Sequence, residues 1–535
     1  MTGVVVCPQP RAADIGADIL ARGGNAFDAA LATAFAQMVH DPFMCGMGGM
    51  GTMVWFRADT GEAGSIDFYN RAGAKVTPDM WAKDFKGRTE ISGYTLFNDY
   101  RSEIGYTAIM TPGTLAGLGE AHARHGSLPW AELIAPAAQD ARDGIVVTPH
   151  VRNTWIRYRQ PGIPDGKTRI RATAECARIF LRPDGEFFDI GETVRNPDMA
   201  DTLDIVADKG PQEFYTGELG ARIAADLAAN GSYVTAGDLR DYRPQAGKPL
   251  ESSYRGYTVY SNPPPGSGAT LIEMLNILEH FDLGATHHSS AEHVDLVARA
   301  MAAAHADRNE HLGDPAHADV PTEMLISKDR AAKWAEKIKE GAFLGDGKEA
   351  PPSCTTHLGV QDAQGNAVAL THTLGTSAGV VTPGLGFVYN NSMKLFDPLP
   401  GRRNSMAAGK ARTTGMCPTI FVKDGRARLV CGAPGGSVII SAVLQSILNV
   451  VDFGMTAIEA VTVPRIHCEG GRVHAEATVP LREIRRLEAM GHEVEHMPYS
   501  FGPSMSRAHI IETTHVGRVR AGSDPRGGAG VSYAW

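Results

Sequence analysis

The spacing of apolar residues in the first part of the chain changes between the helical and the strand period. Apolar side chains recur at helical spacing until the pair Gly23-Gly24 ends the pattern. Asn25 is well suited to cap the next helix, which is rich in alanine and can pack closely on a sheet. The region predicts helices over 11–23 and 27–40 and strands over 52–56 and 65–69.

The pattern changes character near residue 354. Before this point we predict two helices within 113–145, a strand over 254–260 and an alanine-rich helix over 292–312. Residues 341–354 are rich in Gly and Pro and keep no period, so they are the best candidate for a loop or a processing site. The remainder predicts one helix over 437–451 and strands over 355–361, 366–374, 386–391, 418–425 and 426–432.

The segment after this break predicts a β-hairpin that brings two threonines together. A three-residue loop places Gly365 where positive φ is favoured and makes Asp362 and Asn366 the closing pair. Counting back from that pair sets Thr355 opposite Thr373. Directly opposed side chains have Cβ atoms about 4.5–5.5 Å apart, so two hydroxyls meet at the end of the hairpin. An ordinary threonine pair in a sheet fits the same pattern.

A second candidate feature is the turn Pro434-Gly435-Gly436-Ser437, between a predicted strand and an apolar helix. Free N–H groups at the start of a helix point outward and favour negative charge. Two glycines let a reacting carbonyl approach the backbone closely, as an oxyanion hole requires. A plain strand-to-helix turn with a serine cap is the alternative.

Composition and charge argue against several other functions. The 535 residues carry a formal net charge of -9 without a Lys/Arg-rich run, so we expect no nucleic-acid partner. No stretch approaches the ~20 apolar residues of a membrane span, and the first residues lack signal-peptide features. The cysteines are scattered and odd in number, which indicates a reducing compartment and a cytoplasmic protein.

Neither a cofactor nor a metal is predicted. The run GMGGMG at 46–51 follows a predicted helix, whereas a dinucleotide-binding loop follows a strand. The histidine pairs 287/288 and 305/311 lack the i, i+4 spacing that puts two ligands on one helix face.

Motifs spread over nearly the whole chain resemble the γ-glutamyltranspeptidase family. They are GGNAFDAALATAFA (23–36), GMGGMG (46–51), TPGTLAGLGEAHARHGSLPW (111–130), YRGYTVYSNPPPGSG (254–268), HADRNEHLGDP (305–315), TTHLGVQDAQGNAVALT (355–371), GFVYNN (386–391), GAPGGS (432–437) and SDPRGG (523–528). Nine motifs in the same order make the resemblance specific.

The resemblance implies an α+β fold, the four-layer αββα sandwich of N-terminal-nucleophile hydrolases. It also implies an inactive precursor that cuts itself between Cys354 and Thr355. Residues 1–354 and 355–535 then become the large and small subunits of one intertwined unit. A single such unit is the simplest assembly, and a further homodimer stays open.

The expected chemistry places the nucleophile and its base in one residue. A threonine hydroxyl is a weak nucleophile that needs an adjacent base. After cleavage Thr355 has a free α-amino group, whose ordinary pKa is about 7.7–8.0. By resemblance, Thr373 contacts the nucleophile and assists cleavage, while Gly435 and Gly436 form the oxyanion hole. His357 shares a face with Thr355 by strand alternation, where it either orients the nucleophile or packs in the sheet.

The positions that bind a glutamyl group in this family differ here. Tyr69 stands where the family has the Arg that binds the substrate carboxylate, and Arg71 follows two residues later, on the same face if the strand continues. Leu395 replaces the Asp that binds the substrate ammonium group, and Lys394 replaces its acidic neighbour. The remaining substrate-binding positions by resemblance are Asn390, Ser392, Thr414 and Gly415.

These differences predict an amidohydrolase that acts on a small acyl amide without a glutamyl ammonium group. An ammonium group buried opposite Leu395 has no partner, which is strongly disfavoured. The acyl group is then uncharged or anionic, as in a dicarboxylic or keto acid, with Lys394 and Arg71 as anion contacts or as solvated surface charges. The acyl-enzyme passes to water or to an amine. Two alternatives stay open: a γ-glutamyltransferase or glutathione hydrolase with Arg71 in a re-formed clamp, and a non-catalytic protein that binds a metabolite.

Overall fold

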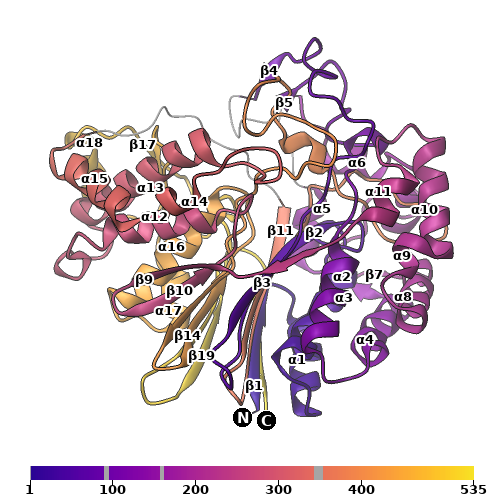
Figure 1. Cartoon of the computed structure of the whole chain (residues 1–535), viewed down its shortest axis with the longest axis horizontal. Coiled ribbons are helices and arrows are strands. Elements are labelled where there is room, and N and C mark those ends of the chain that lie inside the picture. Colours follow the sequence, from indigo (N-terminus) through magenta and orange to yellow (C-terminus); the bar gives the residue numbers. More distant parts are fainter. Residues whose placement is uncertain (1, 90–94, 157–161, 343–353) are drawn as a thin grey trace.

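The fold stacks two β-sheets face to face between two layers of helices (Figure 1). The computed structural model describes residues 2–89, 95–156, 162–342 and 354–535. Most of the predicted processing segment 341–354 therefore lies outside the described residues. The arrangement confirms the predicted αββα sandwich.

The first sheet has seven strands in the order β20-β1-β11-β12-β2-β3-β8, and every neighbouring pair is antiparallel. Its strands are β1 (Gly3–Cys7), β2 (Met50–Phe56), β3 (Ala63–Phe68), β8 (Gln245–Gly247), β11 (Cys354–Asp362), β12 (Ala367–Gly375) and β20 (Gly530–Ala534). Because β1 pairs with β20, the first and last strands of the chain lie side by side (Figure 1).

The second sheet has six strands in the order β19-β18-β14-β13-β10-β9. They are β9 (Leu250–Tyr254), β10 (Tyr257–Ser261), β13 (Thr419–Lys423), β14 (Arg426–Gly432), β18 (His509–Thr513) and β19 (Val519–Ser523). Both sheets combine strands from before and after residue 354, so the two segments of the chain fold together.

Helices divide between the two outer faces (Figure 1). The first sheet is covered by α1 (Pro10–Ala21), α2 (Ala26–His40), α3 (Thr114–His125), α4 (Trp130–Asp143), α5 (Pro149–Ile156), α6 (Gly166–Ile170), α7 (Ala174–Phe180), α8 (Pro197–Lys209), α9 (Glu213–Thr216), α10 (Glu218–Ala229) and α11 (Ala236–Asp241). The second is covered by α12 (Gly268–Leu278), α13 (Ala291–His311), α14 (Thr322–Leu325), α15 (Lys328–Lys339), α16 (Val438–Val451), α17 (Ala457–Thr462) and α18 (Leu481–Ala489). Within the described ranges, no helix is long and apolar enough to cross a membrane.

Short elements connect the layers. They are the strand pairs β4 (Gly87–Arg88) with β5 (Thr95–Leu96) and β6 (Ile145–Val146) with β7 (Thr193–Val194), the small sheet of β15 (Ile466–His467), β16 (Val473–Ala475) and β17 (Val494–His496), and the 3₁₀ turns η1 (Tyr106–Ala108), η2 (Leu283–Ala285), η3 (Ser392–Leu395) and η4 (Pro503–Met505).

Because side chains alternate along a strand, the first sheet packs against the helices on one face and against the second sheet on the other. On β12, Val368 and Leu370 pack against the helices, whereas Ala367 and Ala369 face the second sheet. Small side chains on the inner face let the two sheets approach each other closely. Asn25 caps α2 as predicted, because its side chain accepts hydrogen bonds from the backbone at the start of that helix.

Three predictions of secondary structure are wrong. The predicted strand 254–260 is a hairpin, because Arg255 and Gly256 both have positive φ, as a tight two-residue turn requires. The predicted strand 386–391 is a loop with a single bridge, from Tyr389 to Gly48. The described part of the chain after 354 holds three helices rather than one: α17 has only six residues, and the prediction missed the helical spacing of Ile484 and Leu487, the buried apolar residues of α18.

Asp362 ties the β11–β12 hairpin to the start of α2. Its carboxylate accepts hydrogen bonds from the backbone nitrogens of Ala26, at 3.0 Å, and Asn366, at 2.9 Å. Removing that carboxylate leaves the buried N–H of Ala26 and the partly buried N–H of Asn366 without this acceptor. We expect Asp362→Ala, measured by urea denaturation in an uncut Thr355→Ala background, to lower the free energy of unfolding by about 2–3 kcal/mol. Asp59→Ala, at an exposed ion pair with Arg57, is the control and leaves the free energy of unfolding nearly unchanged. Equal losses in both variants would contradict this role.

Candidate active site

Thr355 and Thr373 meet at the end of the β11–β12 hairpin, as predicted. The register pairs Thr356 with His372 and continues regularly to the turn, with one irregularity between residues 354 and 356. The Thr355 hydroxyl donates to the Thr373 Oγ1 at 3.2 Å, and that oxygen also accepts the backbone N–H of Gly375 at 2.8 Å. Thr355 is 2% exposed. The predicted nucleophile is therefore held in one orientation inside the protein.

The hydroxyl of the next residue, Thr356, is fixed on the opposite face of the sheet. The side-chain amide nitrogen of Gln37, on α2, donates to the Thr356 Oγ1 at 3.0 Å. The side-chain oxygen of Gln37 lies 2.8 Å from the His372 Nε2. These contacts keep Thr356 on the helix side, so alternation keeps Thr355 on the side of the second sheet. Sequence analysis missed Gln37, although a buried glutamine within an alanine-rich helix was a visible signal.

His357 packs between the two sheets. Its Nδ1 lies 2.8 Å from the Thr371 hydroxyl, and a Cβ added to Gly432 would stand 2.2 Å from its ring. Burial holds the pKa of His357 well below its ordinary value, so the ring is neutral. Of the two predicted roles, the structure shows the packing one. The contact also brings the end of β14 directly over β11.

The loop between β14 and α16 begins at this contact. Gly435 and Gly436 both have positive φ, 139° and 72°, which glycine adopts readily. Gly415 lies against this loop, because a Cβ added there would stand 2.0 Å from the Gly436 carbonyl oxygen. The carbonyl of the adjacent Thr414 accepts the Ser267 hydroxyl at 2.7 Å. Gly415 thus packs directly on the predicted oxyanion loop, while the bond from Ser267 to Thr414 fixes the segment that carries Gly415.

The predicted carboxylate-binding positions are occupied differently. The strand β3 ends at Phe68, so the expectation that Arg71 shares a strand face with Tyr69 does not hold. The Tyr69 hydroxyl is buried and accepts the Asn262 side-chain amide at 2.9 Å. Arg71 forms an ion pair with the buried Asp314 at 2.8 Å. Arg71 is therefore partly buried and paired rather than a solvated charge.

Asn390 and Ser392 are used in holding loops together. The Asn390 amide donates to the carbonyls of Gly48 and Met110, both at 2.8 Å. The Ser392 hydroxyl donates to the side-chain oxygen of Asn70 at 2.7 Å. The loop 386–391 is therefore held by side-chain bonds from Asn390 to the backbone carbonyls of other segments rather than by the hydrogen-bond ladder of a strand.

Lys394 is buried in a charged cluster. It is 3% exposed, donates to the Thr376 hydroxyl at 2.8 Å, and lies 3.7 Å from a carboxylate oxygen of Glu103. Glu103 also pairs with the buried Arg169 at 2.8 Å. The alternative of a solvated Lys394 is therefore wrong. Leu395, the last residue of η3, is partly buried.

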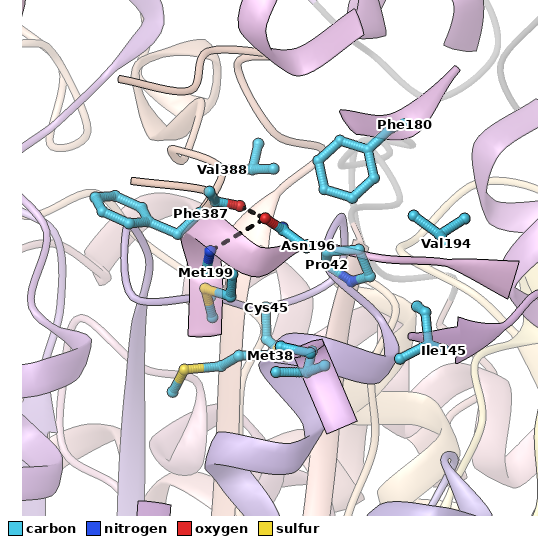
Figure 2. A pocket seen from close by; sticks show the side chains of 14 residues that line it. Met38, Pro42, Cys45, Ile145, Phe180, Val194, Asn196, Met199, Phe387 and Val388 are labelled. Carbon is cyan, nitrogen blue, oxygen red and sulfur yellow. Dashed lines mark hydrogen bonds between the residues drawn. The ribbon is translucent and has the colours of Figure 1, made fainter. Parts of the chain in front are cut away.

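A small cavity lies on the helix side of the first sheet (Figure 2). Its volume of about 20 Å³ suits one water molecule. Figure 2 shows an apolar lining that includes Cys45 and Phe180, with the Asn196 side chain hydrogen-bonded to the Met199 nitrogen. The cavity is too small for an acyl amide and is not the substrate site.

Comparison with known families agrees with this geometry. The family model described as gamma-glutamyltranspeptidase matches residues 12–534. The chain belongs to the γ-glutamyltranspeptidase family. The expected class, an enzyme with the N-terminal-nucleophile hydrolase fold, is thereby confirmed at the level of the family.

Relatives within this family carry two kinds of name. The glutathione hydrolase proenzyme of Escherichia coli (strain K12) is 35% identical, over 98% of this chain and 90% of that protein. The acylase ACY 1 proenzyme of Pseudomonas sp. (strain V22) is 38% identical, over 93% of this chain and 88% of that protein. The crystal structure of cephalosporin acylase from Bacillus halodurans superposes with a TM-score of 0.87 at 28% identity, covering 100% of this chain and 96% of that one.

Glu103 is the counter-ion of two buried cations, Lys394 and Arg169. Burial raises the pKa of Glu103, but Lys394 and Arg169 outweigh it and the pKa lies below its ordinary value. Its contribution to stability is therefore present above the ordinary glutamate pKa and is lost as the pH falls through the lower folded-state pKa.

We expect Glu103→Gln to destabilise the protein by about 3–5 kcal/mol, because two buried cations lose their counter-ion. Glu120→Gln, at an exposed i, i+4 pair with Arg124, is the matched control and changes stability by less than about 0.5 kcal/mol. Chemical denaturation at neutral pH measures both. A Glu103 variant as stable as the control would show that Lys394 and Arg169 do not need this carboxylate.

Proposed function

We propose that this chain is an autoprocessing amidohydrolase whose nucleophile is Thr355. The supporting observation is the 3.2 Å contact between the Thr355 and Thr373 hydroxyls, on the strand whose His357 contacts Gly432, three residues before the Gly435–Gly436 loop. A hydroxyl held by a neighbouring hydroxyl suits addition to a carbonyl, and the glycine loop would supply the backbone N–H donors that stabilise the oxyanion.

Processing follows from the same geometry. The Thr355 hydroxyl adds to the carbonyl of Cys354, and the peptide C–N bond breaks to leave an ester and a free α-amino group on Thr355. One water molecule then hydrolyses the ester and releases the carboxyl end at Cys354. Because β11 and β12 lie in the middle of the first sheet, the two products stay in one folded unit.

Turnover uses the amine that processing releases. The Thr355 α-amino group, with an ordinary pKa near 7.7–8.0, takes the hydroxyl proton as that oxygen adds to the substrate carbonyl. The N–H groups of Gly435 and Gly436 stabilise the oxyanion. The protonated amine passes its proton to the leaving amine, and the acyl ester on Thr355 is then transferred to water, or to an amine that competes with water.

The preferred acyl group lacks a glutamyl ammonium group. Leu395 offers no negative charge, and the nearby Glu103 is already engaged by Arg169 and Lys394. A bound ammonium group would therefore lack a counter-ion, which is strongly disfavoured. The similarity to proteins named acylases supports a simple acyl amide as substrate. A glutathione hydrolase with Arg71 in a re-formed clamp is disfavoured because Asp314 holds Arg71.

Processing is tested on denaturing gels. We expect the wild-type chain to give two bands and Thr355→Ala to give one, because the variant has no hydroxyl to attack the Cys354 carbonyl. Thr355→Ser keeps the hydroxyl and is expected to be cut, while Thr373→Ala slows cutting about 10- to 100-fold through loss of the hydroxyl contact. Amino-terminal sequencing of the smaller fragment should begin Thr-Thr-His. Any other start, or cutting of Thr355→Ala, rules out this nucleophile.

Substrate class is tested with a panel of acyl p-nitroanilides. We expect kcat/KM for a simple acyl amide to exceed that for γ-glutamyl-p-nitroanilide at least about tenfold, since the glutamyl ammonium group has no partner. Rates with the preferred substrate should fall as the pH drops below about 7.7, where the α-amino group becomes protonated. Equal or faster turnover of the γ-glutamyl compound would instead support a glutathione hydrolase.

A further inference from the structure

One buried cation near the candidate active site lacks an acidic partner among the described residues. Arg412 is 2% exposed, and the hydrogen bond from its side chain runs from Nη1 to the Thr413 carbonyl at 3.0 Å. Its Nε and Nη2 meet no acceptor in the described ranges. Burial lowers the pKa of Arg412 to about 9, so the guanidinium stays charged at neutral pH. A buried charge without a counter-ion is strongly disfavoured.

The unused edge of Arg412 is the edge that binds carboxylates side-on. Parallel N–H groups on Nε and Nη2 match the two oxygens of a carboxylate. The chain uses this arrangement elsewhere: Arg330 donates through Nε and Nη2 to the two oxygens of Asp307, at 2.7 and 2.5 Å. Arg412 thus offers a complete carboxylate site to which no described residue contributes the anion.

Arg412 also lies in the segment that connects the two sides of the candidate site. On one side, the backbone of Lys410 accepts the N–H of Ala72, the residue after Arg71, at 2.9 Å. On the other side, three residues after Arg412, Gly415 packs on the carbonyl of the oxyanion loop. The backbone segment that carries Arg412 therefore joins the predicted carboxylate-binding positions to the predicted oxyanion loop.

The position of Tyr69 indicates how far Arg412 lies from the nucleophile Thr355. An electrostatic interaction with Tyr69 partly offsets the lowering of the Arg412 pKa by burial, so the two side chains are neighbours. Tyr69 directly follows β3, while Thr373 pairs with Met50 on the adjacent β2. Three strand spacings of ~4.8 Å put the backbones of Thr355 and Tyr69 about 14 Å apart. A short acyl group on Thr355 and an arginine side chain reaching toward it together span such a gap.

We propose that Arg412 binds a terminal carboxylate on the acyl group, so that the preferred substrate is the amide of a short dicarboxylic acid. This inference rests on the proposed acyl transfer to Thr355. The acyl carbonyl lies at Thr355, and the far carboxylate accepts hydrogen bonds from the Nε and Nη2 of Arg412. The two cations expected in this role are already paired, Arg71 with Asp314 and Lys394 with Glu103.

Matched substrates test this assignment by turnover. Glutaryl-p-nitroanilide carries the carboxylate, and the corresponding carboxamide has the same shape without the charge. We expect wild-type kcat/KM to favour the carboxylate about 10- to 100-fold, and Arg412→Met to lose that preference mainly through KM. Arg412→Lys keeps the charge without the side-on edge and is expected to retain part of the preference. Arg71→Met should keep the wild-type ratio; loss of the ratio there, and not in Arg412→Met, would transfer the role to Arg71.

A binding measurement separates this inference from the proposed reaction. Glutarate should raise the melting temperature of the processed wild-type protein and leave Arg412→Met unshifted, while glutaramide shifts neither. Without ligand, Arg412→Met should melt at the wild-type temperature or above it, because it removes an unpaired buried charge. A stabilisation by glutarate that survives in Arg412→Met overturns the proposal, as does no shift in either protein. If glutarate binds through Arg412 but no amide is hydrolysed, the carboxylate site stands and the proposed hydrolysis fails.

Discussion

The contact between the Thr355 and Thr373 hydroxyls depends on one constraint, the register of the β11–β12 hairpin. A slip of one residue would turn Thr355 toward the helices and put Thr356 in its place, because side chains alternate across a strand. The register is held from three sides. Asp362 closes the turn, Gln37 holds Thr356 on the helix face, and the inner-face position of His357 leaves no room for a side chain at Gly432.

Close approach of backbones is the second requirement of the site. The end of β14 can lie over β11 only because Gly432 carries no side chain above the His357 ring. The same is true where Gly415 meets the carbonyl of Gly436. Each glycine removes atoms at the point where two strands or loops meet, so the two sheets together position a loop that neither sheet could hold alone.

Some of the buried charges around the site stabilise the fold, whereas one is suited to bind the substrate. Glu103 satisfies Lys394 and Arg169, and Asp314 satisfies Arg71, so these charges stabilise loops around the site. Arg412 differs because the side-on edge of its guanidinium has no acceptor among the described residues. An unpaired cation kept beside a reaction centre suits a ligand that brings its own negative charge.

Local sequence alone determined the cap at Asn25, the hairpin turn at Gly365 and the glycine loop before α16, because each depends on residues a few positions apart. The pairing of Thr355 with Thr373 followed from the turn by counting. Tertiary structure decided the partners of Lys394 and Arg71, since Glu103 and Asp314 are distant in sequence and are brought near only when the layers pack. It also decided that Arg412 is buried with no acidic partner in the described part of the chain, because a sequence shows which charges exist but not which of them meet.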